Sequence, residues 1–291
     1  MIVWPDNLVR DLVEGRCVIF LGAGISCNST NTAGKSPKSW KDVLLSFANK
    51  VVDNKKKKSI LNSIVRSDYL MACELVKNIL GDDVFNDLLK SEFLIPGFLP
   101  SQIHKEIFKL DAAVVITPNF DKIYDTYIAA EAKGTIPILN YYSDDIVDFI
   151  RSGTPIVLKI HGTIDEPAKL IFSKKDYAFA RNCYASFYKL LEALILTKTF
   201  LFLGSGLNDP DIQLLLENHC FQYRNRRKHY FVVPEKQYSR DELTVYESTL
   251  NLSFLEYKWR DRSHYSMDFL ESISELSKKV ETEKESRVRV S

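Results

Sequence analysis

Four short apolar runs of the sequence each end in residue types that bind phosphates, orient hydroxyl groups or move protons. The runs with their endings are CVIFLGAG (17–24), AAVVITPNFD (112–121), PIVLKIHG (155–162) and TFLFLGSG (199–206). Glycine allows close approach of a backbone to a phosphate, amides and carboxylates hold hydroxyls or water, and imidazole exchanges a proton near neutral pH. These endings are therefore the candidate chemical groups of the protein.

The first ending, GAGIS (22–26), follows its apolar run directly. Gly22 and Gly24 can form a tight turn there and bring the backbone close to a pyrophosphate at a helix N-terminus. The usual dinucleotide fingerprint has a third glycine where this chain has Cys27, and no G-x-x-x-x-G-K-S/T loop occurs. A standard dehydrogenase and a P-loop NTPase are therefore disfavoured, while a plain strand-to-helix turn without a ligand remains the alternative.

Two further endings carry polar side chains. TPNFD (117–121) places Asn119 and Asp121 two residues apart, where they can hydrogen-bond ribose hydroxyls or hold a water. KIHGT (159–163) places His161 at the end of another run, and we expect its imidazole to be exposed at a crevice. Each has a structural alternative, a capped turn for the first pair and a structural histidine for the second.

The elements that position these residues follow from the hydrophobic pattern. The runs are rich in Val, Ile, Leu and Phe without alternation, which is typical of strands buried on both faces of a parallel sheet. Segments with helical spacing lie between them, such as 39–52 and 187–197, and further strand candidates are 229–234 and 252–259, the second near an edge. The sequence predicts an α/β, Rossmann-like, mostly parallel sheet of about six strands with helices on both faces. Ligands of such sheets bind beyond the carboxyl ends of the strands.

The domain organisation follows from where this alternation is interrupted. No strong strand pattern occurs in residues 28–110, which predicts a helical insertion module between the first two strands. The sheet domain, which carries the candidate chemical groups, then comprises residues 1–27 and 111–276. Residues 277–291 lose their apolar face, so we expect a flexible tail there.

Composition excludes several classes of protein. The 291 residues are 45% hydrophobic and 26% charged, which is ordinary for a globular protein. The net charge of +1 provides no field for nucleic acid, so no direct nucleic acid binding is expected. Five cysteines without a C-x-x-C pair argue against a disulfide framework and a structural zinc. The chain lacks a signal-peptide pattern and any apolar run of about 18 residues, which predicts a cytoplasmic protein without a membrane partner.

Taken together, the endings resemble the sirtuin superfamily, in which GAGIS, TPNFD, KIHGT and FLGSGLNDPDI occur in this order and spacing. The resemblance spans roughly residues 16–234, and in motif order it is most similar to sirtuin-like domains of bacterial anti-phage defence proteins, which degrade NAD. It implies that Asn119 and His161 are catalytic, with Asn119 orienting water or ribose and His161 acting as a base or ribose contact. The residues that it implies to contact NAD are Gly22, Ala23, Gly24, Ser26, Asp121, Gly204 and Ser205.

Departures from the family pattern narrow the implied activity. Deacylating sirtuins carry a four-cysteine zinc module and a Gly-Ile-Pro-type segment after the phosphate loop, where this chain reads CNSTNTAGKSPKSW (27–40). Pro118 also replaces the glutamine expected before Asn119, which affects the nicotinamide pocket. The segment Asp209–Asp211 continues a version of the Gly-Ser turn that is frequent in the defence branch.

The resemblance therefore implies an NAD glycohydrolase that cleaves the nicotinamide–ribose bond, with NAD as a consumed substrate and no metal. It also implies an anti-phage defence effector that a separate sensor or regulatory protein, or a homo-oligomer, switches on, because an unregulated NADase harms its own cell. Two alternatives stay open. One is an NAD-dependent protein deacylase or ADP-ribosyltransferase, and the other is a catalytically silent module that senses NAD or ADP-ribose.

Overall fold

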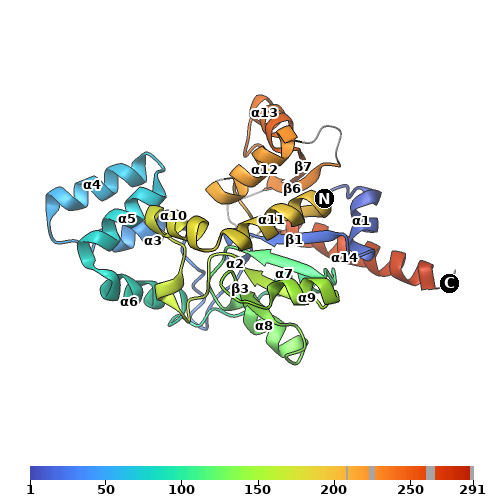
Figure 1. Cartoon of the computed structure of the whole chain (residues 1–291), viewed down its shortest axis with the longest axis horizontal. Helices are drawn as coiled ribbons and strands as arrows, with labels where there is room; N and C mark the ends of the chain where they lie inside the picture. The colour runs from blue at the N-terminus through green and yellow to red at the C-terminus, as the bar shows by residue number, and fades with distance from the viewer. Residues whose placement is uncertain (208, 223–226, 260–265, 289–291) are drawn as a thin grey trace.

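The computed structural model describes residues 1–207, 209–222, 227–259 and 266–288. Within these ranges the chain forms a parallel seven-stranded sheet of order β3-β4-β2-β1-β5-β6-β7, which confirms the predicted α/β, Rossmann-like fold (Figure 1). The strands are β1 (Cys17–Leu21), β2 (Val114–Thr117), β3 (Ile138–Asn140), β4 (Ile156–Lys159), β5 (Thr199–Leu203), β6 (His229–Pro234) and β7 (Leu252–Tyr257). The strand beyond the expected six is β3, whose three residues are too few to show a pattern.

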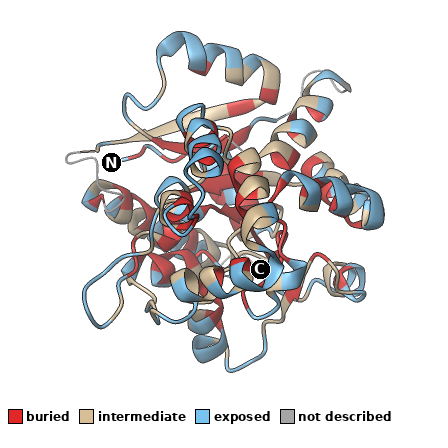
Figure 2. Cartoon of the chain, turned by 90° about the vertical axis from the view of Figure 1, so that its left-hand side faces the viewer, coloured by how far each residue is buried: buried red, intermediate tan, exposed pale blue. Residues whose placement is uncertain are grey.

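The central strands are apolar throughout because both faces of the sheet are covered. Every residue of β1 is buried, and its neighbour β5 is buried from Phe200 onward. Aromatic rings pack in a row across one face, with Phe202 centred 5.1 Å from Phe20 and 5.3 Å from Phe231. Strand β7 is half-buried and forms one edge, as its mixed sequence predicted. Figure 2 shows buried residues concentrated on the sheet and on the inner sides of the helices.

Helices form two layers around this sheet. One face is covered by α1 (Asp6–Val13), α7 (Gln102–Phe108), α8 (Ile123–Glu131) and α14 (Met267–Val288). The other face is covered by α9 (Ile146–Ser152), α10 (Lys174–Cys183), α11 (Ala185–Thr197), α12 (Pro210–Gln222) and α13 (Arg240–Leu250). The four-residue α2 (Ala23–Ser26) and the 3₁₀ turn η1 (Pro167–Lys169) complete the secondary structure outside the module. No helix of the described ranges is long and apolar enough to cross a membrane.

The segment predicted as an insertion module divides into two parts. Helices α3 (Trp40–Ala48), α4 (Asn54–Val65), α5 (Tyr69–Leu80) and α6 (Asp82–Phe93) share a separate core and extend from the sheet at the left of Figure 1. Helix α7 packs on the sheet instead, because Ile103 and Ile107 belong to the core of that layer. The core of the module also includes Ile164, Leu170 and Phe172, which follow β4 in the chain. The observed module therefore differs from the predicted insertion at residues 28–110.

The predicted flexible tail is wrong for residues 277–288, which continue α14 to Val288. Ser277 and Val280 are buried, and the Ser277 hydroxyl donates to Glu106 of α7 at 3.1 Å. Arg287 pairs with Glu14 after α1 at 2.8 Å. Because these partners are distant in the sequence, a local apolar pattern did not reveal them, and residues 289–291 lie outside the described ranges.

Candidate active site

Hydrogen bonds connect the carboxyl ends of four neighbouring strands into one continuous edge. The amide of Ile160 after β4 donates to the Thr117 carbonyl of β2 at 2.9 Å. The Thr117 hydroxyl donates to the Leu21 carbonyl of β1 at 2.7 Å. The Gly22 amide then donates to the Leu203 carbonyl of β5 at 2.9 Å. The four sequence endings therefore lie side by side in the order β4, β2, β1, β5.

The glycines of the first and last endings are required by contact between two turns. The Gly24 amide donates to the Gly204 carbonyl at 2.8 Å, and a Cβ on Gly24 would lie 2.8 Å from that oxygen. A Cβ on Gly22 would overlap the backbone of Ser205. Gly204 has a φ of +61°, in the left-handed region that favours glycine. The amides of Gly22 and Gly24 are thus used within the protein, and contact of this loop with a phosphate stays a prediction.

Asn119, Ser26 and Asp121 form one hydrogen-bonded group above this edge. The Asn119 side-chain NH₂ donates to the Gly22 carbonyl at 3.0 Å and to the Ser26 hydroxyl at 3.1 Å. The Ser26 hydroxyl donates in turn to Asp121 Oδ2 at 2.7 Å, while Asp121 Oδ1 accepts from the Ile123 amide at 2.9 Å. Since its NH₂ is held from two sides, the carbonyl oxygen of Asn119 is the group that can accept from a water or a ribose hydroxyl.

A buried ion pair supports this group from below. Lys159, the last residue of β4, is 1% exposed and donates to the Asp121 backbone carbonyl at 2.5 Å and to the Asp125 carboxylate at 2.8 Å. Burial raises the pKa of Asp125, and the Lys159 ammonium opposes that rise. Our sequence analysis missed this pair, although a lysine inside a run buried on both faces signals a charged partner.

His161 is held in a second group of side chains. Its Nε2 lies 3.2 Å from Asp209 Oδ2 and 3.4 Å from the Tyr177 hydroxyl, which donates to the same Asp209 oxygen at 3.3 Å. Burial, and then the Asp209 charge, hold the pKa of Tyr177 well above its usual range, so the phenol stays protonated. The expectation of an exposed imidazole is wrong, because His161 contacts Tyr177 and Asp209 and its side chain is only 9% exposed.

Asp209 has a fixed position because it also begins α12. Its Oδ1 accepts the amides of Asp211 and Ile212 at 3.0 Å each, as an N-cap residue does. Asp211 is paired with Arg181 at 2.5 Å and accepts from the Tyr188 hydroxyl at 2.8 Å, and burial raises its pKa. These contacts give the Asp209–Asp211 segment a structural role, while Asn208, directly before it, lies outside the described residues.

The Asn119 group and the His161 group lie at the same edge of the sheet, and no hydrogen bond joins them among the described residues. Asn119, Ser26, Asp121 and the two glycine turns form a single contacting set, and His161 follows the adjacent strand β4. His161 follows β4 and contacts Asp209, which follows β5. Because β2 and β1 lie between β4 and β5 in the sheet, this contact crosses the ends of the two central strands.

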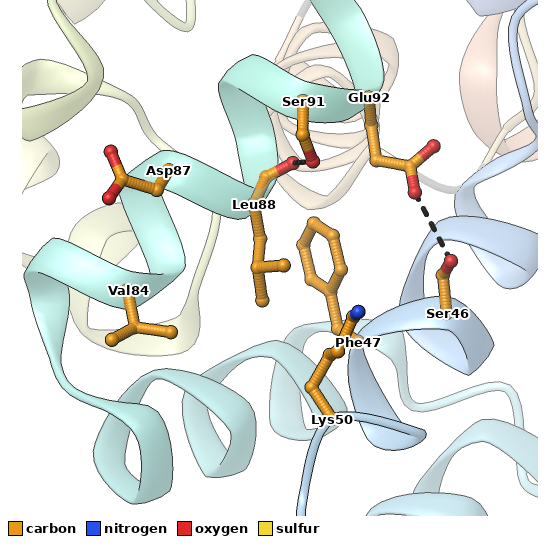
Figure 3. Close-up of a pocket in the computed structure, with 8 residues that line it drawn as sticks. All are labelled: Ser46, Phe47, Lys50, Val84, Asp87, Leu88, Ser91 and Glu92. Atoms are coloured by element: carbon orange, nitrogen blue, oxygen red, sulfur yellow. Dashed lines mark hydrogen bonds between the residues drawn. The ribbon is translucent and has the colours of Figure 1, made fainter.

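The cavity at the strand ends is smaller than the ligand-binding crevice that the sequence analysis expects there. The cavity at these strand ends holds about 10 Å³ for the centre of a water molecule and is lined by Asn119, Ser26, Asp121 and their neighbours. A larger pocket of about 510 Å³ lies between α3 and α6 of the helical module, away from the strand ends (Figure 3). Admission of a dinucleotide at the strand ends therefore requires side chains to move from the positions described.

Comparison with known proteins agrees with this fold. Residues 113–255 match the family model of the SIR2-like domain, which confirms the sirtuin resemblance. The chain is 24% identical to NAD(+) hydrolase ThsA of Acinetobacter baumannii (strain 532279) over 266 residues, 90% of this chain and 51% of that protein. It is 25% identical to defense-associated sirtuin 2 of Bacillus subtilis over 279 residues, 90% of this chain and 26% of that protein.

A third relative supports the same family. NAD(+) hydrolase ThsA of Enterococcus faecium is 27% identical over 225 residues, 76% of this chain and 43% of that protein. The chain thus spans about half the length, or less, of the curated relatives that it matches.

Proposed function

We propose that this chain is a sirtuin-like NAD glycohydrolase that converts NAD and water into nicotinamide and ADP-ribose. The observation that carries the proposal is the anchored amide of Asn119, held by Gly22 and Ser26 at the centre of the carboxyl edge. The names of two relatives as NAD(+) hydrolases support the same reaction. NAD is then a consumed substrate, and Asp121 and the two glycine turns are its proposed contacts.

The proposed mechanism uses one residue from each group. The bond between C1′ of the ribose and the nicotinamide nitrogen breaks, its electron pair leaves with neutral nicotinamide, and positive charge develops on the ribose. The carbonyl oxygen of Asn119 accepts a hydrogen bond from the attacking water and orients its oxygen toward C1′. His161 accepts the proton that this water loses, or holds a ribose hydroxyl, while the Asp209 carboxylate at 3.2 Å holds the ring in position. The proposed catalytic residues are therefore Asn119 and His161.

Control of this activity is proposed to come from outside the sheet domain. A relative is a defense-associated sirtuin, and free hydrolysis of NAD would exhaust the cell that makes the enzyme. We therefore place this chain in anti-phage defence, silent until a homo-oligomer forms or a separate regulatory protein acts. We expect the activity per chain to rise with protein concentration. Light scattering should show a larger mass at the same concentrations. Full activity of a monomer at every dilution would contradict this control.

The deciding experiment is incubation of the purified chain with NAD, followed by chromatography of nicotinamide and ADP-ribose. It is run alone and with the product of a neighbouring gene. The variant Asn119→Ala should lose the activity, whereas Asn182→Ala should keep it, because the exposed Asn182 side chain donates within its own helix, to the Ala178 carbonyl. NAD binding by wild type without product under any condition would favour a silent sensing module, and transfer of ADP-ribose to protein would favour the transferase alternative.

A further inference from the structure

A buried histidine lies next to the Asn119 group and belongs to none of the four strand endings of the sequence analysis. His104 belongs to the first turn of α7, is 0% exposed, and lines the small cavity of about 10 Å³ at the strand ends. The same cavity is lined by Ser26, Thr117, Asn119 and Asp121. A histidine that belongs to another layer of the fold therefore faces the side chains that hold the proposed catalytic amide.

The hydrogen bonds of α7 determine which nitrogen of His104 carries the proton. The Ser101 amide donates to Nδ1 at 3.1 Å, so Nδ1 must be the unprotonated, accepting nitrogen. Burial lowers the pKa of His104 to about 4, against the attraction of the Asp121 carboxylate, so the ring is neutral at pH 7. The single ring proton is therefore on Nε2, which acts as a hydrogen-bond donor.

That donor has no hydrogen-bonding partner within the part of the chain that the structure describes. A buried N–H without an acceptor is costly, by about 1–3 kcal/mol. The cavity beside it has the volume that one water molecule needs, and its polar lining supplies enough partners to hold one. Asp121 lines the same cavity, and its carboxylate can accept more than the two hydrogen bonds that Ser26 and Ile123 donate.

We propose that this cavity is a binding site for one internal water molecule, which accepts from His104 Nε2 and donates to the Asp121 carboxylate. His104 is then a positioning residue for Asn119. The water keeps Asp121 oriented toward Ser26, and Ser26 accepts from the Asn119 amide while its own proton points to Asp121. The positioning role rests on the proposed catalytic function of Asn119, whereas the water site itself does not.

The water site is tested directly by a high-resolution crystal structure of the wild-type chain. We expect an ordered water within hydrogen-bonding distance of both His104 Nε2 and an Asp121 oxygen. A direct contact between the ring and Asp121, or a cavity without density for water, would overturn the proposal. This result does not depend on whether the chain hydrolyses NAD.

The positioning role is tested by a matched pair of variants. His104→Asn retains an acceptor near the position of Nδ1 for the Ser101 amide but removes the Nε2 donor. His104→Gln places an amide NH₂ near the position of Nε2 and so retains the donor to the water. We expect His104→Asn to lower kcat for NAD hydrolysis about tenfold with KM unchanged, and His104→Gln to restore most of it.

Melting temperatures separate this role from a general loss of structure. Equal kcat values for both variants and wild type would refute the positioning role while leaving NAD hydrolysis in place. Equal losses in kcat that follow equal losses in melting temperature would assign His104 a purely structural role. A wild-type chain that never hydrolyses NAD would instead refute the proposed function, and the crystallographic result would still decide the water site.

Discussion

The two halves of the candidate site each contain a buried histidine, and the two rings are held in different ways. In the half around Asn119, backbone carbonyls and a glycine contact fix the polar groups, and His104 meets a cavity rather than a carboxylate. In the other half, His161 contacts the Asp209 carboxylate and the Tyr177 phenol. In the first half, backbone groups of Gly22 and Ile123 hold Asn119 and Asp121, so we expect that half to resist adjustment. The second half is held by side chains of α10 and of the residue before α12. We therefore expect movement that admits a substrate to occur at the His161 half.

Acid should affect the first half through His104. Its pKa is lowered from 6.5 to about 4 by burial, so between those values the unfolded chain binds a proton that the folded chain does not. Stability from this group is full above pH 6.5 and falls as the pH drops toward 4, by up to about 3 kcal/mol. Denaturant unfolding at pH 7 and pH 5 measures this loss.

Other groups that titrate beside the ring need a control. Asp121, Tyr124 and Asp125 line the same cavity, and carboxylates elsewhere also respond to acid. The His104→Gln variant lacks only the ring, so its loss between pH 7 and pH 5 should be smaller than that of wild type. An identical loss in both proteins would show that His104 does not set the acid response.

Removal of the second histidine should affect activity rather than folding. His161→Ala should lower NAD hydrolysis about a hundredfold or more, the effect of losing a positioned base, and should leave the cooperative melt intact. Nicotinamide release in single-turnover mixtures measures the loss. If the variant releases nicotinamide at the wild-type rate, His161 is structural and the mechanism must be rebuilt around Asn119.

The glycine contact can be tested by crowding the first half. Gly24→Ala should destabilise the fold by about 2 kcal/mol, because the added methyl group meets the Gly204 carbonyl oxygen at 2.8 Å, within backbone that cannot easily move. Ala23→Gly is the matched change in the same turn, and without new overlap it should cost less. Equal unfolding free energies for Gly24→Ala and wild type would show that this half adjusts more readily than proposed.

The smallest expected effect belongs to the partner of His161. Asp209→Asn retains a cap for the Asp211 and Ile212 amides but removes the carboxylate from the ring, so we expect a fall of about tenfold in kcat. Steady-state kinetics of NAD hydrolysis measure this fall, with the melting temperature of the variant as the control for folding. An unchanged kcat would contradict a role for Asp209 in the reaction.

Much of the fold followed from the sequence because strand burial leaves a local trace. Runs of Val, Ile, Leu and Phe bounded by glycine or polar residues predicted the central strands, and parallel topology placed their endings at one edge. Only β3, with three residues, was missed. The candidate residues Gly22, Asn119 and Asp121 do lie together at that edge, whereas their roles toward NAD remain predictions.

The pattern of the chain determined the sheet and the order of its endings, because each strand shows its environment in its own few residues. Only the tertiary structure decided which side chains meet there. Three pairs of residues join separate elements of the fold: Lys159 pairs with Asp125, His161 contacts Asp209, and His104 and Asp121 line one cavity. The contact between α14 and α7, found where a flexible tail was expected, also joins residues that are distant in the sequence. Such contacts depend on long-range packing, which no local periodicity records.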